Sequence, residues 1–388
     1  MIKTLHNTEP ISSSATSTGI LHTLQSDGWR LDLKSPLFAN SSCTFEKHSP
    51  APSPDYSPPQ SLSQVPSKLW AMHKNHAGFV TSSPPLKVTL KSDATLPCIR
   101  QYRLSPEALD GIQPVITSLL SQGILKETTS PCNTPILPLP KPGRTDEWRF
   151  VQDLRAVNNC VVPITPIVPD THTILSSIPS DSTHYTVIDL CSAFFSIPVH
   201  PDSQYLFSFT YKRKQYTWTR MPQGYTESPT IYAAAVNRDL ADLHLLGNST
   251  LIQYADDLLL ASPSKDVCIK DTLPLLTHLA NKGHSASLSK MQYCQEHVQY
   301  LGHVLHNGTR QLSQGRITTL LSTTRPQTKK QMMSFLGMAN FCRQWIFEYR
   351  AMEAVLRNAT LNDKPVNIEW SEEINIAFES LKKALPQL

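Results

Sequence analysis

The sequence predicts an α+β fold. Helical and strand-like apolar patterns follow one another without the strict strand–helix–strand alternation that produces a parallel α/β sheet. The chain has 388 residues, of which 40% are hydrophobic, so its length suits two or three domains with a sizeable core. Residues 1–66 differ from the rest because they are rich in Ser, Pro and Thr and bury too little apolar surface to fold alone. We expect a disordered leader there, with packing from KLWAM, 68–72, onward.

The composition argues against several classes of protein. A net charge of +4 permits a polyanionic partner without demanding one. No segment reaches the roughly 18 consecutive apolar residues of a membrane span, and the N-terminus lacks the apolar core of a signal peptide. The eight cysteines are scattered without a CxxC pair, which argues against a zinc site or a disulfide framework. We expect a cytoplasmic protein with no membrane partner.

The first predicted elements are a helix and three strands. SPEALDGIQPVITSLLSQGILKE, from residue 105, begins with a Ser cap, has apolar residues at helical spacing and closes at Gly123. TPILPLPKPGRTDEWRFVQDL, 134–154, predicts a strand, a turn and a strand. HYTVIDL, 184–190, has the apolar run of a short buried strand.

A hairpin, a helix and a second pair of strands are predicted next. FSFTYKRKQYTWTRM, 207–221, is typical of a hairpin with basic residues at its tip. SPTIYAAAVNRDLADLHLL, 228–246, predicts a helix. LIQYADDLLLA, 251–261, contains two β-type apolar runs on either side of two aspartates.

The last part of the chain is predicted to be mostly helical. DVCIKDTLPLLTHLANKG, 266–283, predicts a helix, and short strands are expected around SASL, 285–288, and QYLGHVL, 299–305. Residues 329–357 are expected to be helical, and SEEINIAFESLKKAL, 371–385, predicts an amphipathic helix.

Asp256 and Asp257 stand side by side inside an otherwise apolar run. Burying charge is costly unless it is paired or bound to a metal. The strand–turn–strand context places both at a hairpin tip, where Asp189, at the end of 184–190, is positioned to join them. Three carboxylates over an apolar floor suit hard divalent cations that hold substrate phosphates. The alternative is an ordinary Asp-Asp turn, although such turns normally have Gly, Asn or Pro nearby.

Several motifs, in the right order, resemble those of retroviral reverse transcriptases, and most of all the gammaretrovirus-like group with its endogenous elements. YADD resembles the Y-x-D-D box of that family. The resemblance covers roughly residues 68–388 and rests also on these stretches: SPCNTPILPLPKPGRTDEWRFVQDLRAVN for the fingers, YTVIDLCSAFFSIPVHPDSQYLFSFTY for the first palm strand, WTRMPQGYTESPTIY beside the nucleotide site, QYLGHVL for the primer grip and KKQMMSFLGMANFCRQWI for the thumb.

The resemblance implies a right-hand polymerase fold and a DNA polymerase activity. The implied domains are the leader at 1–66, fingers and palm at 67–310, the thumb at 311–362 and the start of a connection region at 363–388. The implied reaction is RNA- and DNA-templated extension of a primer 3′-hydroxyl with dNTPs by a monomer, with two Mg²⁺ ions or Mn²⁺ in their place. No protease or ribonuclease H domain is recognised. The alternative is an inactive endogenous retroviral remnant that only binds nucleic acid.

The resemblance also implies which residues hold metal. Asp189 and Asp256 would bind the ions directly, Asp257 would be more peripheral, and the backbone carbonyl of Leu190 would also reach the metal. These three aspartates would be the catalytic residues. Positioning and charge neutralisation supply most of the rate in such phosphoryl transfers.

Further residues match the nucleotide site of the family. Arg149 and Lys141 would clasp the triphosphate, although two solvated surface cations are the simpler reading of the bare residues. Phe194 would pack under the deoxyribose and select dNTPs over rNTPs, while Phe195 is expected in the core. Gln223 would contact the nucleotide near its sugar and base, with a turn-capping glutamine as the alternative.

The remaining assignments concern the template and the primer. Asp153 and Arg155 would support the fingers and contact the template, or form a structural salt bridge. Tyr254 would contact the primer end, or simply be a packed tyrosine. The basic hairpin tip, 212–214, would add phosphate affinity or be only a solvated face. The expected primer grip consists of Tyr300, Leu301 and Gly302.

The sequence departs from the family pattern at two places near the predicted site. Cys191 and Ser192 stand where close relatives carry a charged pair, which removes no metal ligand. Ala255 stands where valine or methionine is usual in the Y-x-D-D box, and its smaller side chain is expected to change how the primer end sits.

Overall fold

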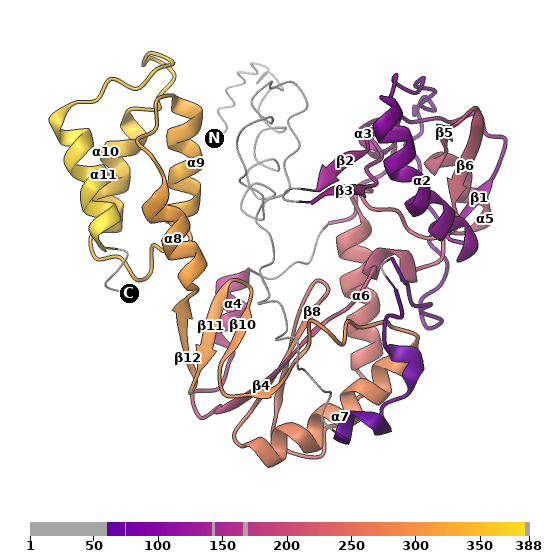
Figure 1. Ribbon diagram of the computed structural model, residues 1–388, viewed down its shortest axis with the longest axis horizontal. Coiled ribbons are helices and arrows are strands. Elements are labelled where there is room, and N and C mark those ends of the chain that lie inside the picture. The colour runs from indigo at the N-terminus through magenta and orange to yellow at the C-terminus, as the bar shows by residue number, and fades with distance from the viewer. Residues whose placement is uncertain (1–59, 74, 142–143, 166–169, 385–388) are drawn as a thin grey trace, which may run out of the picture. The chain divides into compact units, whose positions relative to one another are not determined.

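A computed structural model describes residues 60–73, 75–141, 144–165 and 170–384 (Figure 1). Among these, residues 60–313 form one compact unit and residues 314–384 form another. Each unit has its own set of buried side chains. No described helix combines the length and the apolar character that crossing a membrane requires.

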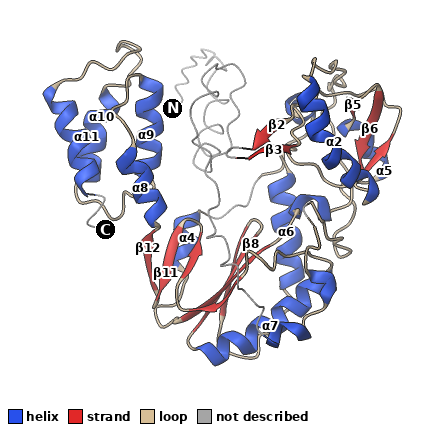
Figure 2. Cartoon of the chain, in the orientation of Figure 1, coloured by secondary structure: helices blue, strands red, loops and turns tan. Residues whose placement is uncertain are grey.

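The first unit is built on a four-stranded antiparallel sheet in the order β7–β8–β4–β9. Figure 2 shows strand β8 of this sheet in red, with helices α6 and α7 in blue. β4 and β8 pair along their whole lengths, from His184 opposite Ser262 to Asp189 opposite Asp257. The strands are β4 His184–Asp189, β7 Thr250–Tyr254, β8 Asp257–Ser262 and β9 Gln292–Gln295. The helices that pack on the sheet are α4 Thr171–Ser176, α6 Ser228–Leu240 and α7 Lys265–Lys282.

Both faces of this sheet are buried, and successive residues of β8 point to opposite faces. Leu258 and Leu260 belong to the apolar cluster that includes side chains of α6 and α7. Leu259 and Ala261 belong to a second cluster, which includes α4 and the hairpin of β10 (Val298–Tyr300) and β11 (His303–His306). A strand buried on both faces needs apolar residues at every position, which explains the unbroken LLLA run after the aspartates.

A smaller sheet in the order β1–β6–β5 packs beside α2 (Pro106–Ser121). The Ser105 hydroxyl caps α2 by accepting the Ala108 N–H at 3.2 Å. The β5–β6 turn is closed by Lys212 and Arg213, which both have positive φ, as tight two-residue hairpins require. The strands are β1 Leu125–Glu127, β5 Phe209–Tyr211 and β6 Lys214–Trp218.

Gln152 and Trp218 fasten the two-stranded sheet of β2 and β3 to this region. The Trp218 indole N–H donates to the Gln152 side-chain oxygen at 2.7 Å, and the Gln152 amide donates to Thr134 at 2.8 Å. Buried polar groups are costly unless they are hydrogen-bonded, so these contacts favour one position of the β2–β3 sheet relative to β6. The other short elements are η2 Gln60–Gln64, η3 Ser67–Leu69, β2 Leu139–Lys141, β3 Arg144–Arg149, α3 Arg155–Cys160, η4 Ala193–Ser196, α5 Pro201–Gln204, η5 Tyr205–Phe207 and β12 Thr309–Leu312.

The second unit, 314–384, contains four helices among its described residues: α8 Gln314–Ser322, α9 Lys329–Asn340, α10 Tyr349–Asn358 and α11 Glu372–Ala384. Thr328 caps α9 in a capping box with Gln331. Phe335 of α9 and Phe378 of α11 are fully buried, with ring centroids 4.8 Å apart. The Trp370 indole donates to the Pro326 carbonyl at 3.0 Å, so the segment after residue 363 packs within this unit.

The structure differs from the sequence-based prediction at several points. Packing begins before residue 66, because Leu62 and Val65 are buried in the main cluster. Residues 285–288 form no strand; Ala286 makes isolated bridges instead. The expected helix 329–357 is two helices, interrupted by a turn in which Glu348 has positive φ. The strands β9 and β12 and the helix α8 were not predicted, and the predicted leader falls, up to residue 59, outside the described residues.

We expect Leu260→Ala to lower the free energy of unfolding by about 2–5 kcal/mol, because it leaves a cavity in a fully buried strand. The matched variant Leu246→Ala removes the same atoms from a side chain that is 62% exposed, and should change stability by less than about 0.5 kcal/mol. Chemical denaturation of both variants measures the difference. Equal effects would contradict the two-sided burial of β8.

Candidate active site

The aspartate pair lies at the turn of the β7–β8 hairpin. Tyr254, the last residue of β7, pairs with Asp257, the first residue of β8, and the turn between them is Ala255 and Asp256. Ala255 has φ of +51°, a left-handed conformation that a non-glycine residue adopts at some cost. The turn thus holds a strained alanine next to the aspartates, with little room for sequence change.

The end of β4 is fastened to this turn. The Leu190 N–H donates to the Asp256 carbonyl at 2.9 Å, and Asp189 lies opposite Asp257 in the sheet register. The Asp189 carbonyl also accepts the Ser287 N–H at 3.1 Å. The three predicted catalytic aspartates therefore occupy adjacent backbone positions at one end of the sheet. All three are partly exposed, while the leucines that follow them in β8 are fully buried.

Lys290 forms an ion pair with Asp189 at this end of the sheet. Its ammonium lies 3.3 Å from the Asp189 carboxylate, whose side chain is only 14% exposed. Opposite charges at this distance attract, and the attraction is stronger where one of them is largely withdrawn from water. Lys290 thus compensates part of the negative charge that the aspartates bring to the sheet.

Neighbouring side chains are kept neutral by burial and by the aspartates. Burial raises the pKa of Tyr232 well above its ordinary value, and the charge of Asp256 adds to this. Burial likewise raises the pKa of Tyr300, with further contributions from Asp257 and Tyr254. Neutral phenols next to carboxylates can donate hydrogen bonds without adding charge.

The donor set fits a divalent metal such as Mg²⁺. Carboxylate oxygens are the ligands that this ion prefers, and it commonly takes one or two of them while keeping water and substrate phosphates as its other ligands. In the described part of the chain, no three or more His, Cys, Asp or Glu side chains gather closely enough to hold a metal by themselves.

Gln223 is exposed in the loop before α6, and Asn158 of α3 fixes that loop. The Asn158 amide donates to the Gly224 carbonyl at 3.0 Å, and its oxygen accepts the Thr226 N–H at 3.1 Å. Gly224 has φ of +89°, which favours glycine. One amide side chain thus holds both sides of the turn that follows Gln223.

Phe194 and Phe195 have the different surroundings that the sequence predicts. Phe195 is buried and stacks on Trp218 with ring centroids 5.0 Å apart, so it belongs to the core. Phe194 is only partly buried and meets the ring of Tyr232 edge to face, at 6.0 Å between centroids. Tyr232 therefore packs against the ring of Phe194, while part of that ring stays accessible.

The predicted triphosphate and template residues lie apart from the carboxylates in sequence, on β2, β3 and the loop after them. Arg149 is exposed at the end of β3. Lys141 ends β2, and its side chain lies outside the described residues. Arg155 donates to both Asp153 oxygens at 2.8 and 2.7 Å, and this hydrogen bonding lowers the pKa of Asp153. The structural salt bridge is thus present, whichever further contact Asp153 makes.

The predicted primer grip is the turn between β10 and β11. Leu301 and Gly302 form this turn, both with positive φ. Tyr300 is buried, and its hydroxyl donates to the Asp257 carbonyl at 3.5 Å, a long hydrogen bond. The turn and the aspartate hairpin are thus in contact through Tyr300, while Tyr254 packs partly buried against the same apolar cluster.

The chain matches known proteins over most of its length. Residues 139–305 match the family described as reverse transcriptase, an RNA-dependent DNA polymerase. Over 308 residues, 78% of this chain, it is 46% identical to the Pol polyprotein of Feline endogenous virus ECE1; over 324 residues, 84% of this chain, it is 41% identical to the Gag-Pol polyprotein of Walleye dermal sarcoma virus. The chain belongs to the retroviral reverse transcriptase family. It spans 29% and 18% of the length of those two relatives.

Solved reverse transcriptases share the fold. The foamy viral protease-reverse transcriptase in complex with double-stranded DNA is similar with a TM-score of 0.76 and 30% identity, over 82% of this chain and 55% of that one. The same viral protein in complex with an RNA/DNA hybrid gives a TM-score of 0.72. The predicted α+β class and right-hand polymerase fold are thereby confirmed.

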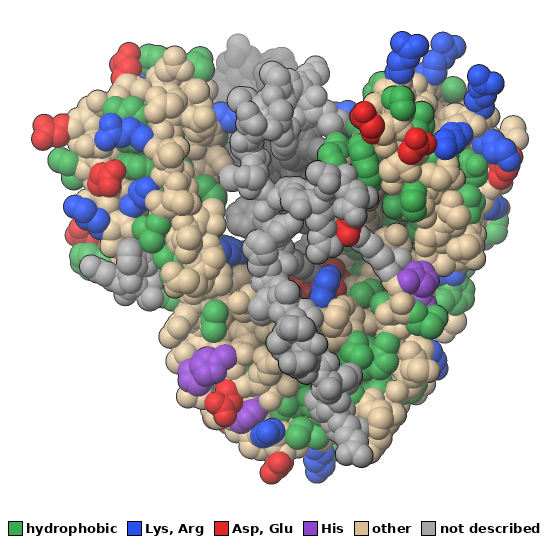
Figure 3. Space-filling model, viewed as in Figure 1, with side chains coloured by type: hydrophobic (Ala, Val, Ile, Leu, Met, Phe, Trp, Pro, Cys, Tyr) green, Lys and Arg blue, Asp and Glu red, His purple; other side chains and the backbone are tan. Residues whose placement is uncertain are grey.

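The basic hairpin tip, residues 212–214, is partly neutralised. Lys214 lies 2.9 Å from Glu127 and Lys212 lies 3.8 Å from Asp110. Lys and Arg side chains nevertheless gather at this end of the unit, over β5, β6 and α2 (Figure 3). Exposed pairs of this kind are weak and screened by salt, so the tip keeps a net positive character.

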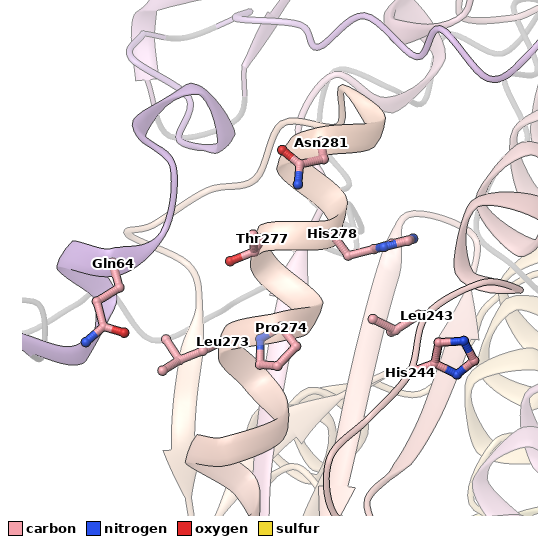
Figure 4. A pocket seen from close by; sticks show the side chains of 8 residues that line it. All are labelled: Gln64, Leu243, His244, Leu273, Pro274, Thr277, His278 and Asn281. Carbon is pink, nitrogen blue, oxygen red and sulfur yellow. The ribbon is translucent and has the colours of Figure 1, made fainter.

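A surface hollow of about 450 Å³ lies on α7, and none of its lining residues is a predicted site residue (Figure 4). Leu273, Pro274 and His278 of α7 line it together with Gln64 of η2 and His244. Its lining carries no aspartate or glutamate, so we assign it no part in polymerase chemistry.

Sequence reasoning missed Lys290, Asn158 and Tyr232. Lys290 stands in SLSK, where nothing in the spacing indicates a partner for Asp189. Asn158 stands in RAVNNC, whose short helix gives no sign of the loop that it binds. Tyr232 has the helical spacing of a core residue, which it also is. Each acts through a contact between distant segments, so only the folded chain reveals it.

We expect Asn158→Ala to speed amide hydrogen exchange at residues 223–226, because the turn loses both side-chain hydrogen bonds. Asn158→Asp is the matched control, since it keeps the oxygen that accepts the Thr226 N–H and loses only the donor to Gly224. Exchange measured by mass spectrometry should rank the alanine variant above the aspartate variant, and both above the unchanged chain. Unchanged exchange in the alanine variant would show that Asn158 does not hold the turn.

Proposed function

We propose that the chain is an RNA-directed and DNA-directed DNA polymerase that extends a primer 3′-hydroxyl with dNTPs. The observation that carries the proposal is the backbone pairing that sets Asp189 opposite Asp257, with Asp256 beside them at the hairpin turn. Support comes from the family and from the foamy viral relatives, which were solved with double-stranded DNA and with an RNA/DNA hybrid.

The proposed chemistry is a two-metal phosphoryl transfer. Asp189 and Asp256, with the Leu190 carbonyl, would hold two Mg²⁺ ions, or Mn²⁺, and Asp257 would assist from the periphery. When bound, such ions activate the attacking hydroxyl and stabilise the charge on the triphosphate. The protein's own part is to hold the carboxylates in register. The sheet supplies the register, and Lys290 keeps the Asp189 carboxylate compensated until the substrate arrives.

The incoming nucleotide would be held by groups from three segments. Arg149 offers a planar fork for the triphosphate and Lys141 a compact charge. Phe194 would pack under the deoxyribose, since its ring is supported by Tyr232 and partly accessible. Gln223 is exposed on a turn that Asn158 fixes, so it can meet the sugar and base without losing much freedom.

The primer end would be held by the hairpins that meet at Asp257. Tyr254 is the cross-strand partner of Asp257, and Tyr300 contacts the Asp257 carbonyl. The turn at Leu301 and Gly302 would hold the primer backbone, and Asp153 would support the template side. A template with its primer and dNTPs are the proposed partners, and we propose that the chain acts as a monomer.

Primer extension on an RNA template, with dNTPs and Mg²⁺, tests the proposal. We expect extension by the unchanged chain and a loss of about 10³-fold or more in Asp256→Asn, because the variant weakens the transition-state charge stabilisation that the carboxylate supports through metal. Asp93→Asn, which removes an exposed carboxylate elsewhere, should extend normally.

Binding of the same template and primer separates the two possible failures. A chain that binds the duplex but never extends it is a nucleic-acid-binding remnant, and the polymerase proposal is then wrong. Extension that survives Asp256→Asn would leave the polymerase standing and refute the assignment of Asp256.

A further inference from the structure

A row of three aromatic rings leads from the proposed sugar contact into the interior. Phe194 meets Tyr232 edge to face at 6.0 Å and 80°. Tyr232 in turn meets the imidazole of His284 edge to face at 6.2 Å and 80°. Tyr232 and His284 are almost fully buried, so neither ring can turn without displacing its neighbours.

The inner end of this row is anchored by a buried pair. The His284 Nε2 lies 2.8 Å from an Asp239 carboxylate oxygen, and the two side chains are 1% and 0% exposed. Burial opposes ionisation of Asp239, but hydrogen bonds from His284 and Ser82 outweigh it, so the pKa of Asp239 is lowered. Removing one partner of such a pair leaves an uncompensated buried charge, which makes the geometry hard to change.

Helix α6 and the end of α7 bring Asp239 and His284 together. Tyr232 and Asp239 lie seven residues apart on α6, which is two helical turns, so both face the same side. His284 follows Gly283, which ends α7 with φ of +88°. A side chain on Gly283 would meet the Phe79 carbonyl at 1.9 Å, so no other residue fits there. The end of α7 is thus fixed against α6 at the point where His284 touches Tyr232.

The charges of Asp256 and Asp239 act on Tyr232, because after burial they contribute most to the raised pKa of its hydroxyl. A shift of the Tyr232 ring would be felt at Phe194, which it meets edge to face. The hydrogen bond between His284 and Asp239 restrains that shift by holding the ring on the other side of Tyr232.

We propose that His284 is a positioning residue that sets Phe194 through the ring of Tyr232, and with it the rejection of ribonucleotides. The inference rests on the proposed function, because it needs Phe194 under the sugar of the nucleotide. A ring that backs the sugar contact must stay within a few tenths of an ångström to exclude one hydroxyl. If the ring is held less firmly, it can move aside for the 2′-hydroxyl of a ribonucleotide. A deoxynucleotide has no 2′-hydroxyl, so its incorporation changes little.

His284→Gln tests the role of the ring, because glutamine keeps an N–H donor for Asp239 and removes the aromatic contact with Tyr232. We expect the ratio of kcat/KM for dNTP over rNTP to fall by about threefold or more, as residues in contact usually show coupling of this order. The dNTP kcat should change less. Asp271→Asn is the matched control, since Asp271 is equally buried but binds the Gly247 and Ser249 N–H groups instead.

Each outcome decides a separate point. An unchanged ratio in a folded His284→Gln overturns the inference, and so does an equal change in Asp271→Asn. If the unchanged chain extends no primer, the proposed function fails.

The coupling itself is then measured by chemical denaturation of His284→Gln, Phe194→Leu and the double variant. Additive losses of stability would overturn the connection between the two residues, and non-additive losses would support it. The same cycle applies if His284→Gln is too unstable for kinetics.

Discussion

The antiparallel pairing of β4 with β8 is the constraint on which the site depends. It sets Asp189 opposite Asp257, and the Leu190 N–H fastens the turn by bonding the Asp256 carbonyl. Because side chains alternate between faces, a slip by one residue would turn every leucine of β8 to the wrong cluster. The two apolar clusters on either face thus set the register, and the register sets the carboxylates. Chemistry at the hairpin tip depends on packing well below it.

Placing three carboxylates at the end of a sheet buried on both faces creates an electrostatic difficulty. Like charges close together repel, and the apolar strands beneath them offer no solvation. Among the described residues, Lys290 forms an ion pair with Asp189, and burial keeps Tyr232 and Tyr300 neutral. The residual attraction for cations at the tip is what a metal-dependent enzyme requires.

The sequence predicted the elements whose signals are local. The helix at 105–123 has its cap and its closing glycine, and the apolar runs on either side of the aspartates became β7 and β8. The sequence-based prediction failed where the deciding contact joins segments that lie far apart in the sequence. Residues 285–288 have a β-like composition, but Ala286 bridges two separate segments instead of joining a sheet. The turn that splits 329–357 depends on a positive φ at Glu348, which composition does not reveal.

The same distinction explains what was foreseen of the site. Asp256 and Asp257 were found because two adjacent charges in an apolar run are unusual in any sequence, and Asp189 was added because it ends a predicted buried strand. Asn158, Lys290 and His284 carry no such mark, since each is an ordinary polar residue until the fold supplies its partner. Supporting residues of this kind are defined by geometry, and their chemistry is common to most protein surfaces and cores.

The ion pair between Lys290 and Asp189 has a consequence for how the protein is assembled. A fold whose acidic cluster were balanced only by metal would need that metal to form, as small zinc domains do. Here a covalently attached ammonium group already serves as a counter-ion. The charge of Asp189 is therefore partly balanced in the metal-free chain, so folding does not have to wait for the metal that the proposed function requires.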